Sequence, residues 1–480
     1  MEIVFVTPEL HPYSKVGGLA DAAAGLAKAL RGLDHRVLVV TPRYEGIDPG
    51  AFSLARRLSP LPVAIGETSE NVVVWDARTA SGVEVALVEH PALTRAGVYG
   101  PAGAAAYPDN ALRFGILGFA ALEIARGLGR KIQIVHAHDW ASCVALHALR
   151  HGGDHGMLDG AQGVLTVHNA QHQGVFEKEW VGRLGLGWEG FHAEGFEFWD
   201  KLSLLKAGLA AASRVTTVSP TYAKEIQTPA GGCGLDGRFS SLGHPLVGIL
   251  NGIDPSIWNP ATDSALASRY DAEQPSGKIL CKSALQAELG LSTGTDAPLV
   301  GAVSRLAEQK GLDLLAAAAA FALRQGTQIA VLGQGDRELA HTFEGLAQQF
   351  PGRLAFRSEF DEALAHRIYA GSDFFVVPSR FEPCGLAQLY AMRYGAVPIV
   401  RRTGGLSDTV VDADVRLTTG TGFVFEAADA DSLQGAIGRA VGAYRDPAGL
   451  RALRRRAMRV DLTWERAARM YEQLYRQVIA

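Results

Sequence analysis

Short runs of β-branched and other apolar residues recur along the chain, separated by stretches of helical character. Continuous apolar strands of this kind are typical of parallel sheets that are buried on both faces. Their alternation with helices through two halves predicts two Rossmann-like, doubly wound α/β domains facing a central cleft. The predicted strands are Ile3–Val6, Val37–Val40, Val85–Val88, Ile132–Val135, Val164–Val167, Val215–Val218, Leu299–Val303, Gln328–Leu332, Phe374–Val377 and Val397–Val400.

The changeover between the halves is predicted at Leu250–Pro255, where turn-forming residues follow a strand-like run and precede an irregular polar stretch. The N-terminal domain then covers residues 1–250, and the C-terminal domain covers residues 251–460.

Three helices are expected in the second half of the chain. Two of them, Leu312–Gln325 and Gly385–Tyr394, begin just after predicted strands. Within residues 461–480, apolar side chains recur at helical spacing over Trp464–Ile479. This pattern predicts an amphipathic C-terminal helix. The periodicity does not decide which domain the helix covers, and we expect it to pack back on the N-terminal domain.

Charge and composition argue against several classes of protein. Forty-six Lys and Arg residues against fifty Asp and Glu residues give a net charge of −4, so binding to nucleic acid or to a membrane surface is not expected. Glu2 stands where a signal peptide would carry its basic region, which favours a cytoplasmic protein. The four cysteines show no C-x-x-C spacing, which argues against disulfide scaffolds and structural zinc.

One pattern, cation-x-Gly-Gly-Leu-x-Asp, occurs once in each half, at Lys15–Asp21 and at Arg402–Asp408. Paired glycines before a helix expose backbone N–H groups, and the helix dipole favours an anion such as phosphate there. A tight strand-to-helix turn is the alternative, but the repetition and the adjacent cation favour anion binding. A Walker A loop is absent, and Glu338 replaces the third glycine of a dinucleotide fingerprint, so nicotinamide chemistry is disfavoured.

A second cationic element follows the predicted strand Leu299–Val303. In an open α/β sheet, ligands bind beyond the carboxyl ends of the strands, where Arg305 and Lys310 must lie. Both side chains could reach a diphosphate and offset the charge of a departing nucleotide. One preorganised contact of this type contributes about 3 kcal/mol to the stabilisation of the transition state. A solvated surface pair is the alternative.

Glu382 lies between Phe381 and Pro383, after one predicted strand and before a predicted helix. The helix dipole stabilises an ionised carboxylate at this position. Such a group suits hydrogen bonds to sugar hydroxyls or a cationic transition state, whereas a plain helix cap is the alternative. We interpret Cys384 as a packed residue, because no histidine is near it in sequence.

Two histidine motifs, His136–Trp140 and Thr166–Asn169, end predicted strands and could face the cleft. The first looks like a metal cluster but has no third ligand at a fixed spacing, so hydrogen-bonded histidines and no metal are expected. Asp412–Asp414 and Asp429–Asp431 match the D-x-D pattern of some sugar transferases. Neither follows a strand, so a turn or a helix cap is predicted for each.

Together these motifs resemble bacterial glycogen synthases and plant starch synthases, which are retaining, ADP-glucose-dependent glycosyltransferases of the GT-B fold. The resemblance implies a hexosyltransferase of glycogen biosynthesis that moves glucose from ADP-glucose to the non-reducing end of glycogen or a maltooligosaccharide, without cofactor or metal. The matching segments follow the family's order: Lys15–Leu19, His138–Trp140, Thr166–Asn169, Val218–Tyr222, Leu250–Asp254, Ser304–Leu306, Gln309–Asp313, Pro378–Leu386 and Arg401–Leu406.

The resemblance also implies that the N-terminal domain lies on the acceptor side and that the C-terminal domain binds the nucleotide sugar. It further implies roles for individual residues. Glu382 would hold the glucosyl 3- and 4-hydroxyls or stabilise positive charge on the ring, and His168 would contact the 6-hydroxyl. The implied catalytic residues are Glu382, His168, Arg305 and Lys310. The implied donor-binding residues are Lys15, Gly17, Gly18, Phe360, Thr403, Gly404 and Gly405, with Phe360 stacking on adenine. The implied residues of the glucosyl and acceptor region are Asp21, Asp139 and Asn251.

The sequence favours a mechanism that needs a single carboxylate. Related retaining transferases carry a second glutamate eight residues after the first, whereas Tyr390 occupies that position here, as glycogen synthases lead one to expect. We therefore expect ADP to leave from the front face, with its phosphate oxygen taking the acceptor's proton. The alternatives are a transferase that uses UDP-glucose or makes a small glucoside, a catalytically silent polyglucan-binding protein, and a phosphorylase.

Overall fold

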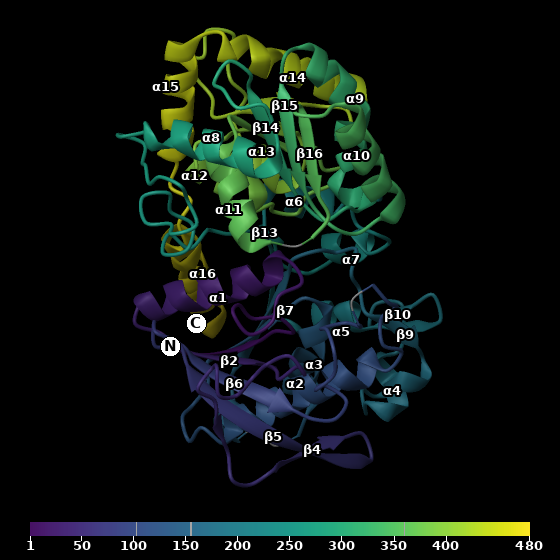
Figure 1. Cartoon of the computed structure of the whole chain (residues 1–480). Helices are drawn as coiled ribbons and strands as arrows, with labels where there is room; N and C mark the ends of the chain where they lie inside the picture. Colours follow the sequence, from purple (N-terminus) through teal and green to yellow (C-terminus); the bar gives the residue numbers. More distant parts are fainter. Residues whose placement is uncertain (102, 154–155, 360) are drawn as a thin grey trace. The chain divides into compact units, whose positions relative to one another are not determined.

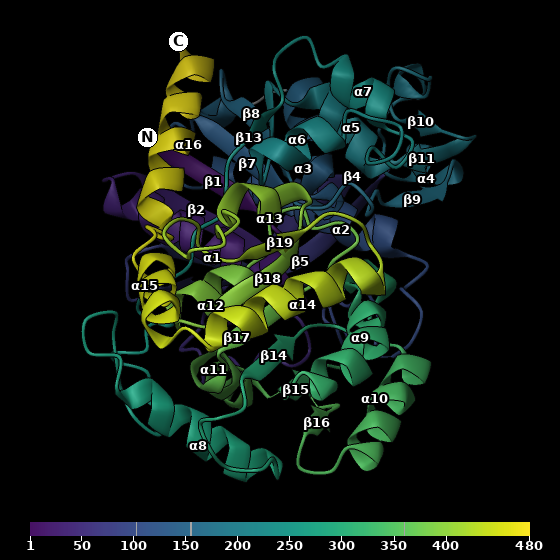
Figure 2. The same ribbon diagram turned by 90° about the horizontal axis from the view of Figure 1, so that it is seen from above.

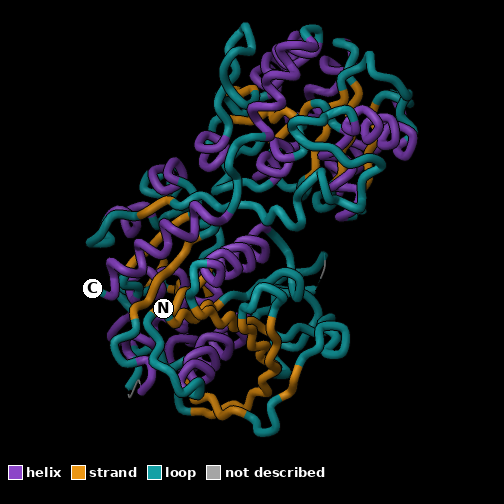
Figure 3. Tube along the Cα trace, turned by 90° about the vertical axis from the view of Figure 1, so that its left-hand side faces the viewer, coloured by secondary structure: helices purple, strands orange, loops and turns teal. Residues whose placement is uncertain are grey.

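A computed structural model describes residues 1–101, 103–153, 156–359 and 361–480 of the chain (Figure 1). The backbone divides into two units, one formed by residues 1–252 with 464–480 and the other by residues 253–463. Each unit contains its own sheet, parallel over most or all of its width, with helices around it, as the orange strands and purple helices of Figure 3 show. The α/β fold class predicted from the apolar runs is therefore confirmed.

The sheet of the first unit is parallel over most of its width and antiparallel at one edge. In sheet order, its parallel strands are β13 (Val247–Gly248), β12 (Arg214–Thr217), β8 (Gln162–Val167), β7 (Ile134–His138), β1 (Glu2–Val6), β2 (Arg36–Pro42) and β6 (Glu84–Glu89). Beyond β6 lies the antiparallel strand β5 (Thr68–Arg78), which pairs with both β3 (Ala55–Arg56) and β4 (Leu61–Ile65). These three strands were not predicted from the sequence, although β5 contains the apolar run Val72–Trp75.

A small separate sheet lies in the same unit, with the order β10 (Glu197–Phe198), β11 (Lys201–Ser203) and β9 (Val175–Glu177). The helices of the first unit are α1 (Gly18–Gly32), α2 (Asn110–Arg126), α3 (Cys143–His151), α4 (Glu179–Arg183), α5 (Leu204–Ala211), α6 (Pro220–Glu225), α7 (Asp236–Ser240) and α16 (Trp464–Ile479).

The C-terminal helix α16 packs against α1 in the first unit. The two helices approach so closely that a Cβ atom on Gly25 of α1 would lie 2.0 Å from Nε1 of Trp464. On its inner side, the hydroxyl of Tyr475 lies 2.7 Å from Nδ1 of His136 in β7. The last residues of the chain are therefore part of the first unit's core, although 211 residues of the second unit (253–463) intervene.

The second unit has a sheet that is parallel throughout. In sheet order, its strands are β16 (Leu354–Arg357), β15 (Gln328–Leu332), β14 (Leu299–Val303), β17 (Phe374–Val377), β18 (Val397–Arg401) and β19 (Phe423–Phe425). Its helices are α8 (Gly277–Leu289), α9 (Leu312–Arg324), α10 (Arg337–Gln349), α11 (Glu362–Gly371), α12 (Ala387–Arg393), α13 (Gly404–Thr409), α14 (Ala430–Tyr444) and α15 (Pro447–Met458).

Both faces of this second sheet are buried, which explains why its strands read as continuous apolar runs. Phe374 and Val376 of β17 point into a cluster with α9, α10 and α14. Phe375 and Val377 point to the other face, into a cluster with α8, α11 and α12. Helix α14 lies beside α9 on the first of these faces (Figure 2).

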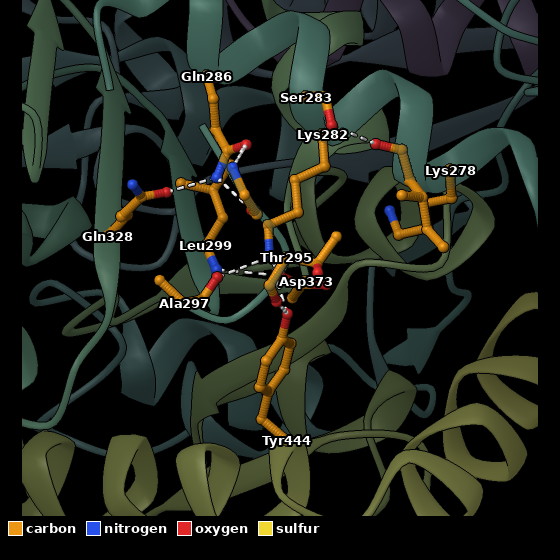
Figure 4. A network of polar contacts seen from close by, with 12 residues as sticks. Lys278, Lys282, Ser283, Gln286, Thr295, Ala297, Leu299, Gln328, Asp373 and Tyr444 are labelled. Carbon is orange, nitrogen blue, oxygen red and sulfur yellow. Dashed lines mark hydrogen bonds and ion pairs between the residues drawn. The ribbon is translucent and has the colours of Figure 1, made fainter. Parts of the chain in front are cut away.

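A buried polar network holds the amino ends of the central strands (Figure 4). The ammonium of Lys282 donates to Ala297 O at 2.6 Å, to Asp373 Oδ2 at 2.7 Å and to the Tyr444 hydroxyl at 2.9 Å. The same Asp373 oxygen accepts from Leu299 N at 3.0 Å. All three N–H groups of the Lys282 ammonium donate hydrogen bonds. These bonds connect α8 with α14 and with the amino ends of β14 and β17, opposite the carboxyl ends of the strands.

Candidate active site

Glu382 lies in the loop between β17 and α12 and is only 6% exposed. Its Oε2 accepts from Nζ of Lys310 at 2.7 Å and from Oγ of Ser379 at 2.9 Å. Lys310 ends a short 3-10 helix, η4 (Glu308–Lys310), that follows the neighbouring strand β14. The carboxyl ends of two adjacent strands thus bring together a carboxylate and a cation that are 72 residues apart in sequence.

A glycine makes this close approach of the two loops possible. Gly311, directly after Lys310, has a φ of +64°, which favours glycine. A Cβ atom there would lie 2.1 Å from the carbonyl oxygen of Pro378. Any larger residue would push the Lys310 loop away from the Glu382 loop.

The second Gly-Gly pair packs against the same loop. The Gly405 N–H, at the start of α13, donates to Glu382 O at 3.0 Å and to Pro383 O at 3.2 Å. A Cβ atom on Gly405 would lie 2.1 Å from Cys384 O. The bare backbone of this glycine is therefore used within the chain, to hold the segment that carries Glu382.

The other cations near these loops differ in their surroundings. Arg305 follows β14 and is exposed, and within the described part of the chain no hydrogen bond or ion pair engages its guanidinium. Arg401, at the end of β18, donates to the carbonyls of Ser379 and Arg380. Arg380 in turn pairs with Asp313 at 2.6 Å. Arg305 is thus available to a ligand, whereas Arg380 and Arg401 brace the loop.

Tyr390, eight residues after Glu382, lies in α12 and stacks on the indole of Trp258, with ring centroids 3.6 Å apart. Thr403, before α13, is buried. Phe360, the predicted adenine platform, lies outside the described residues.

In the first unit, His168 and Asp139 lie together beyond the ends of β8 and β7. Nε2 of His168 is 3.0 Å from Nδ1 of His138, and the His168 backbone N–H donates to Asp139 Oδ1 at 2.6 Å. Asp139 adopts a φ of +58°, which turns its carboxylate back toward the β8 loop. Burial raises the pKa of Asp139 to about 7, although N–H groups of His168 and Asn169 oppose the shift.

The first Gly-Gly loop is held by a carboxylate that sequence analysis missed. Glu9 is 3% exposed, and its Oε2 accepts from Val16 N at 2.6 Å and from Gly17 N at 3.0 Å. Its Oε1 accepts from the Tyr99 hydroxyl at 3.0 Å, and burial raises the pKa of Glu9. One of the glycine amides predicted to face an anion, that of Gly17, therefore already contacts a carboxyl group of the chain itself, as does the neighbouring amide of Val16.

The remaining predicted residues of this unit are also placed. Lys15 is exposed, and its Nζ lies 3.0 Å from Asp21 Oδ2. Gly18 begins α1. Asn251 is half-buried and lies near the end of the first unit's main segment. Within the ranges that the structure describes, no group of three potential ligands is arranged to hold a metal ion, and no helix is long and apolar enough to cross a membrane.

Comparison with known proteins places this geometry in a family. Residues 2–241 match the model of the starch synthase catalytic domain, and residues 297–442 match that of glycosyl transferases group 1. A glycogen synthase of Anaeromyxobacter sp. (strain Fw109-5) is 48% identical, with full coverage of both chains. The chain belongs to the glycogen synthase family. A further glycogen synthase, from Myxococcus xanthus, is 43% identical over the whole of both chains.

Solved structures agree with this membership of the glycogen synthase family. The catalytic domain of starch synthase IV from Arabidopsis thaliana, bound to ADP and acarbose, matches with a TM-score of 0.93 and 34% identity, covering 100% of this chain and 99% of that one. A sucrose-phosphate synthase from Thermosynechococcus elongatus shares the fold, with a TM-score of 0.63 and 20% identity. The predicted GT-B fold and hexosyltransferase class are confirmed.

Proposed function

We propose that this chain transfers glucose from ADP-glucose to the non-reducing 4-hydroxyl of an α-1,4-glucan, with retention of configuration at the anomeric carbon. The observation that carries the proposal is the similarity over the full chain to a starch synthase solved with acarbose and with ADP, a nucleoside diphosphate. The glycogen synthases among its relatives match end to end, which supports the same activity.

In this proposal the second unit binds the activated donor. Arg305 has no competing partner among the described residues and would pair with the diphosphate. Lys310 would divide its N–H groups between the phosphate and Glu382, which lies 2.7 Å away. Backbone groups of Thr403 and Gly404 would contact the distal phosphate. Gly405, whose N–H donates to Glu382 O and Pro383 O, would instead hold the Glu382 loop beside it.

Glu382 would accept hydrogen bonds from the glucosyl hydroxyls and stabilise positive charge on the ring. Its burial, and the donors from Lys310 and Ser379, support this role because they hold the carboxylate in one orientation before substrate arrives. Within the described residues no second carboxylate contacts Glu382. We expect ADP to leave on the face that the acceptor attacks, and its phosphate oxygen to take the acceptor's proton. This mechanism needs only one carboxylate.

The first unit would bind the transferred glucosyl group and the acceptor. His168 would contact the 6-hydroxyl, with its backbone carbonyl near the anomeric carbon. Asp139 supports this assignment, because it fixes the His168 backbone at 2.6 Å. Lys15, Gly17 and Gly18 would reach the donor, while Asp21 and Asn251 would lie in the acceptor region.

The test is steady-state kinetics with glycogen and either ADP-glucose or UDP-glucose. We expect Glu382→Gln to lower kcat at least about 100-fold, because it removes charge where charge develops in the transition state. Arg305→Ala should raise KM for ADP-glucose. Arg324→Ala, at the far end of α9 and also exposed, is the matched control for the loss of a surface arginine. Near wild-type rates for Glu382→Gln and Arg305→Ala would refute the assignment of these residues to the active site. A preference for UDP-glucose would refute the assignment of ADP-glucose as the donor.

A further inference from the structure

Three histidine rings lie in a row inside the first unit. His136 and His138 lie two residues apart on the same face of β7, and His168 follows β8. The ring centroids of His136 and His138 are 4.3 Å apart, and those of His138 and His168 are 5.3 Å apart. Burial lowers the pKa of His136 and of His168 to about 3, and it lowers the pKa of His138 well below its usual value. All three rings are therefore neutral near pH 7.

Of the other two rings, only that of His138 contacts the ring of His168 through a hydrogen bond. Nδ1 of His138 lies 3.0 Å from Nε2 of His168. Both nitrogens of His136 have other partners, the Tyr475 hydroxyl at 2.7 Å and Oγ1 of Thr166 at 2.7 Å. His138 is thus the side chain that decides which nitrogen of His168 carries the proton.

A single proton occupies the contact between two neutral rings, so there are two arrangements. If Nδ1 of His138 is protonated, it donates to Nε2 of His168, and His168 then carries its own proton on Nδ1. In the reverse arrangement His138 carries its proton on Nε2. That atom is buried and has no hydrogen-bond partner in the described structure. In the first arrangement the same nitrogen is an acceptor without a donor. Buried N–H groups without an acceptor are rarer in folded proteins than under-satisfied acceptors, so the first arrangement is favoured.

We propose that His138 is a positioning residue that fixes His168 as the tautomer protonated at Nδ1, which then donates a hydrogen bond to a hydroxyl oxygen of the sugar substrate. No described residue contacts Nδ1 of His168 by a hydrogen bond, and Asp139 fixes the backbone of the same residue. Ring and backbone are thus oriented by two adjacent residues at the end of β7. This inference rests on the proposed function for the identity of the sugar, but not for the tautomer.

The direct test is a ¹⁵N NMR measurement of the imidazole nitrogens in the free protein, with His168→Gln used to assign the signals. We expect His168 to be protonated at Nδ1 and unprotonated at Nε2, and the opposite pattern would overturn the proposal. This readout needs no substrate. A failure of the proposed transferase activity is therefore distinguishable from a failure of the tautomer assignment.

The second test compares two variants of His138. Asn carries an amide N–H that can replace the Nδ1–H donor, whereas Leu fills the space without a donor. We expect His138→Leu to lower kcat/KM for ADP-glucose about tenfold or more, and His138→Asn to recover most of it. Equal losses in the two variants at equal unfolding temperatures would show that only the bulk of the ring matters, and would overturn the proposal. If either variant does not fold, the NMR result decides.

Discussion

Replacing Gly405 by alanine tests whether the second Gly-Gly pair positions Glu382. The new Cβ atom would lie 2.1 Å from Cys384 O and 2.5 Å from the Cys384 carbonyl carbon and Cα. Ordinary contacts begin at 3.4 Å, so the start of α13 and the Glu382 loop must separate by more than an ångström. Both partners are backbone, and no change of side-chain rotamer can relieve the clash.

The expected magnitude follows from these contacts. Separation breaks the hydrogen bonds from Gly405 N to Glu382 O at 3.0 Å and to Pro383 O at 3.2 Å, which costs about 1 kcal/mol. Overpacking adds about 1–3 kcal/mol, so the free energy of unfolding should fall by about 2–4 kcal/mol. Because an error of about 1 Å in the position of a reacting group can cost about 100-fold, kcat should fall by that order.

The assay combines urea unfolding with initial rates on ADP-glucose and glycogen. Gly435→Ala is the matched control, since this glycine lies in α14 of the same unit and its Cβ would meet nothing within 4 Å. We expect the control to keep its rate and to gain up to about 1 kcal/mol of stability. A Gly405→Ala protein with wild-type kcat and wild-type unfolding midpoint would refute the reasoning.

Three further predictions concern buried polar groups. Ser379→Ala removes the hydroxyl 2.9 Å from Glu382 and should lower kcat about tenfold in initial-rate assays, and an unchanged kcat would contradict the positioning role. Lys282→Met removes the ammonium 2.7 Å from Asp373 and should lower the free energy of unfolding in urea by about 3 kcal/mol, whereas a loss below about 1 kcal/mol would show that the network is dispensable. Burial raises the pKa of Asp139 from 3.8 to about 7, so the folded state holds a proton that the unfolded state releases, and stability should fall as pH rises through this range. Asp139→Asn should flatten that part of the profile of unfolding free energy against pH, and an unchanged slope would count against the shift.

The sequence by itself determined the layered α/β fold and which loops carry polar chemistry. A strand covered on both faces is apolar along most of its length, so it can be predicted from a continuous apolar run. The strands β14 (Leu299–Val303), β15 (Gln328–Leu332) and β17 (Phe374–Val377) have the predicted bounds. Helix α16 begins and ends at the predicted residues because its apolar positions recur at helical spacing. Loop positions follow from where these patterns stop.

Contacts between distant loops were decided only by the tertiary structure. Glu9 reaches the amides of Val16 and Gly17 because the chain turns back after β1, and no local pattern distinguishes this carboxylate from a solvated one. His138 meets His168 because β7 and β8 pair in a register that sets His138 opposite Thr166. A sequence pattern indicates how deeply each residue is buried. Which residue it contacts depends on strand order, register and the turns between strands.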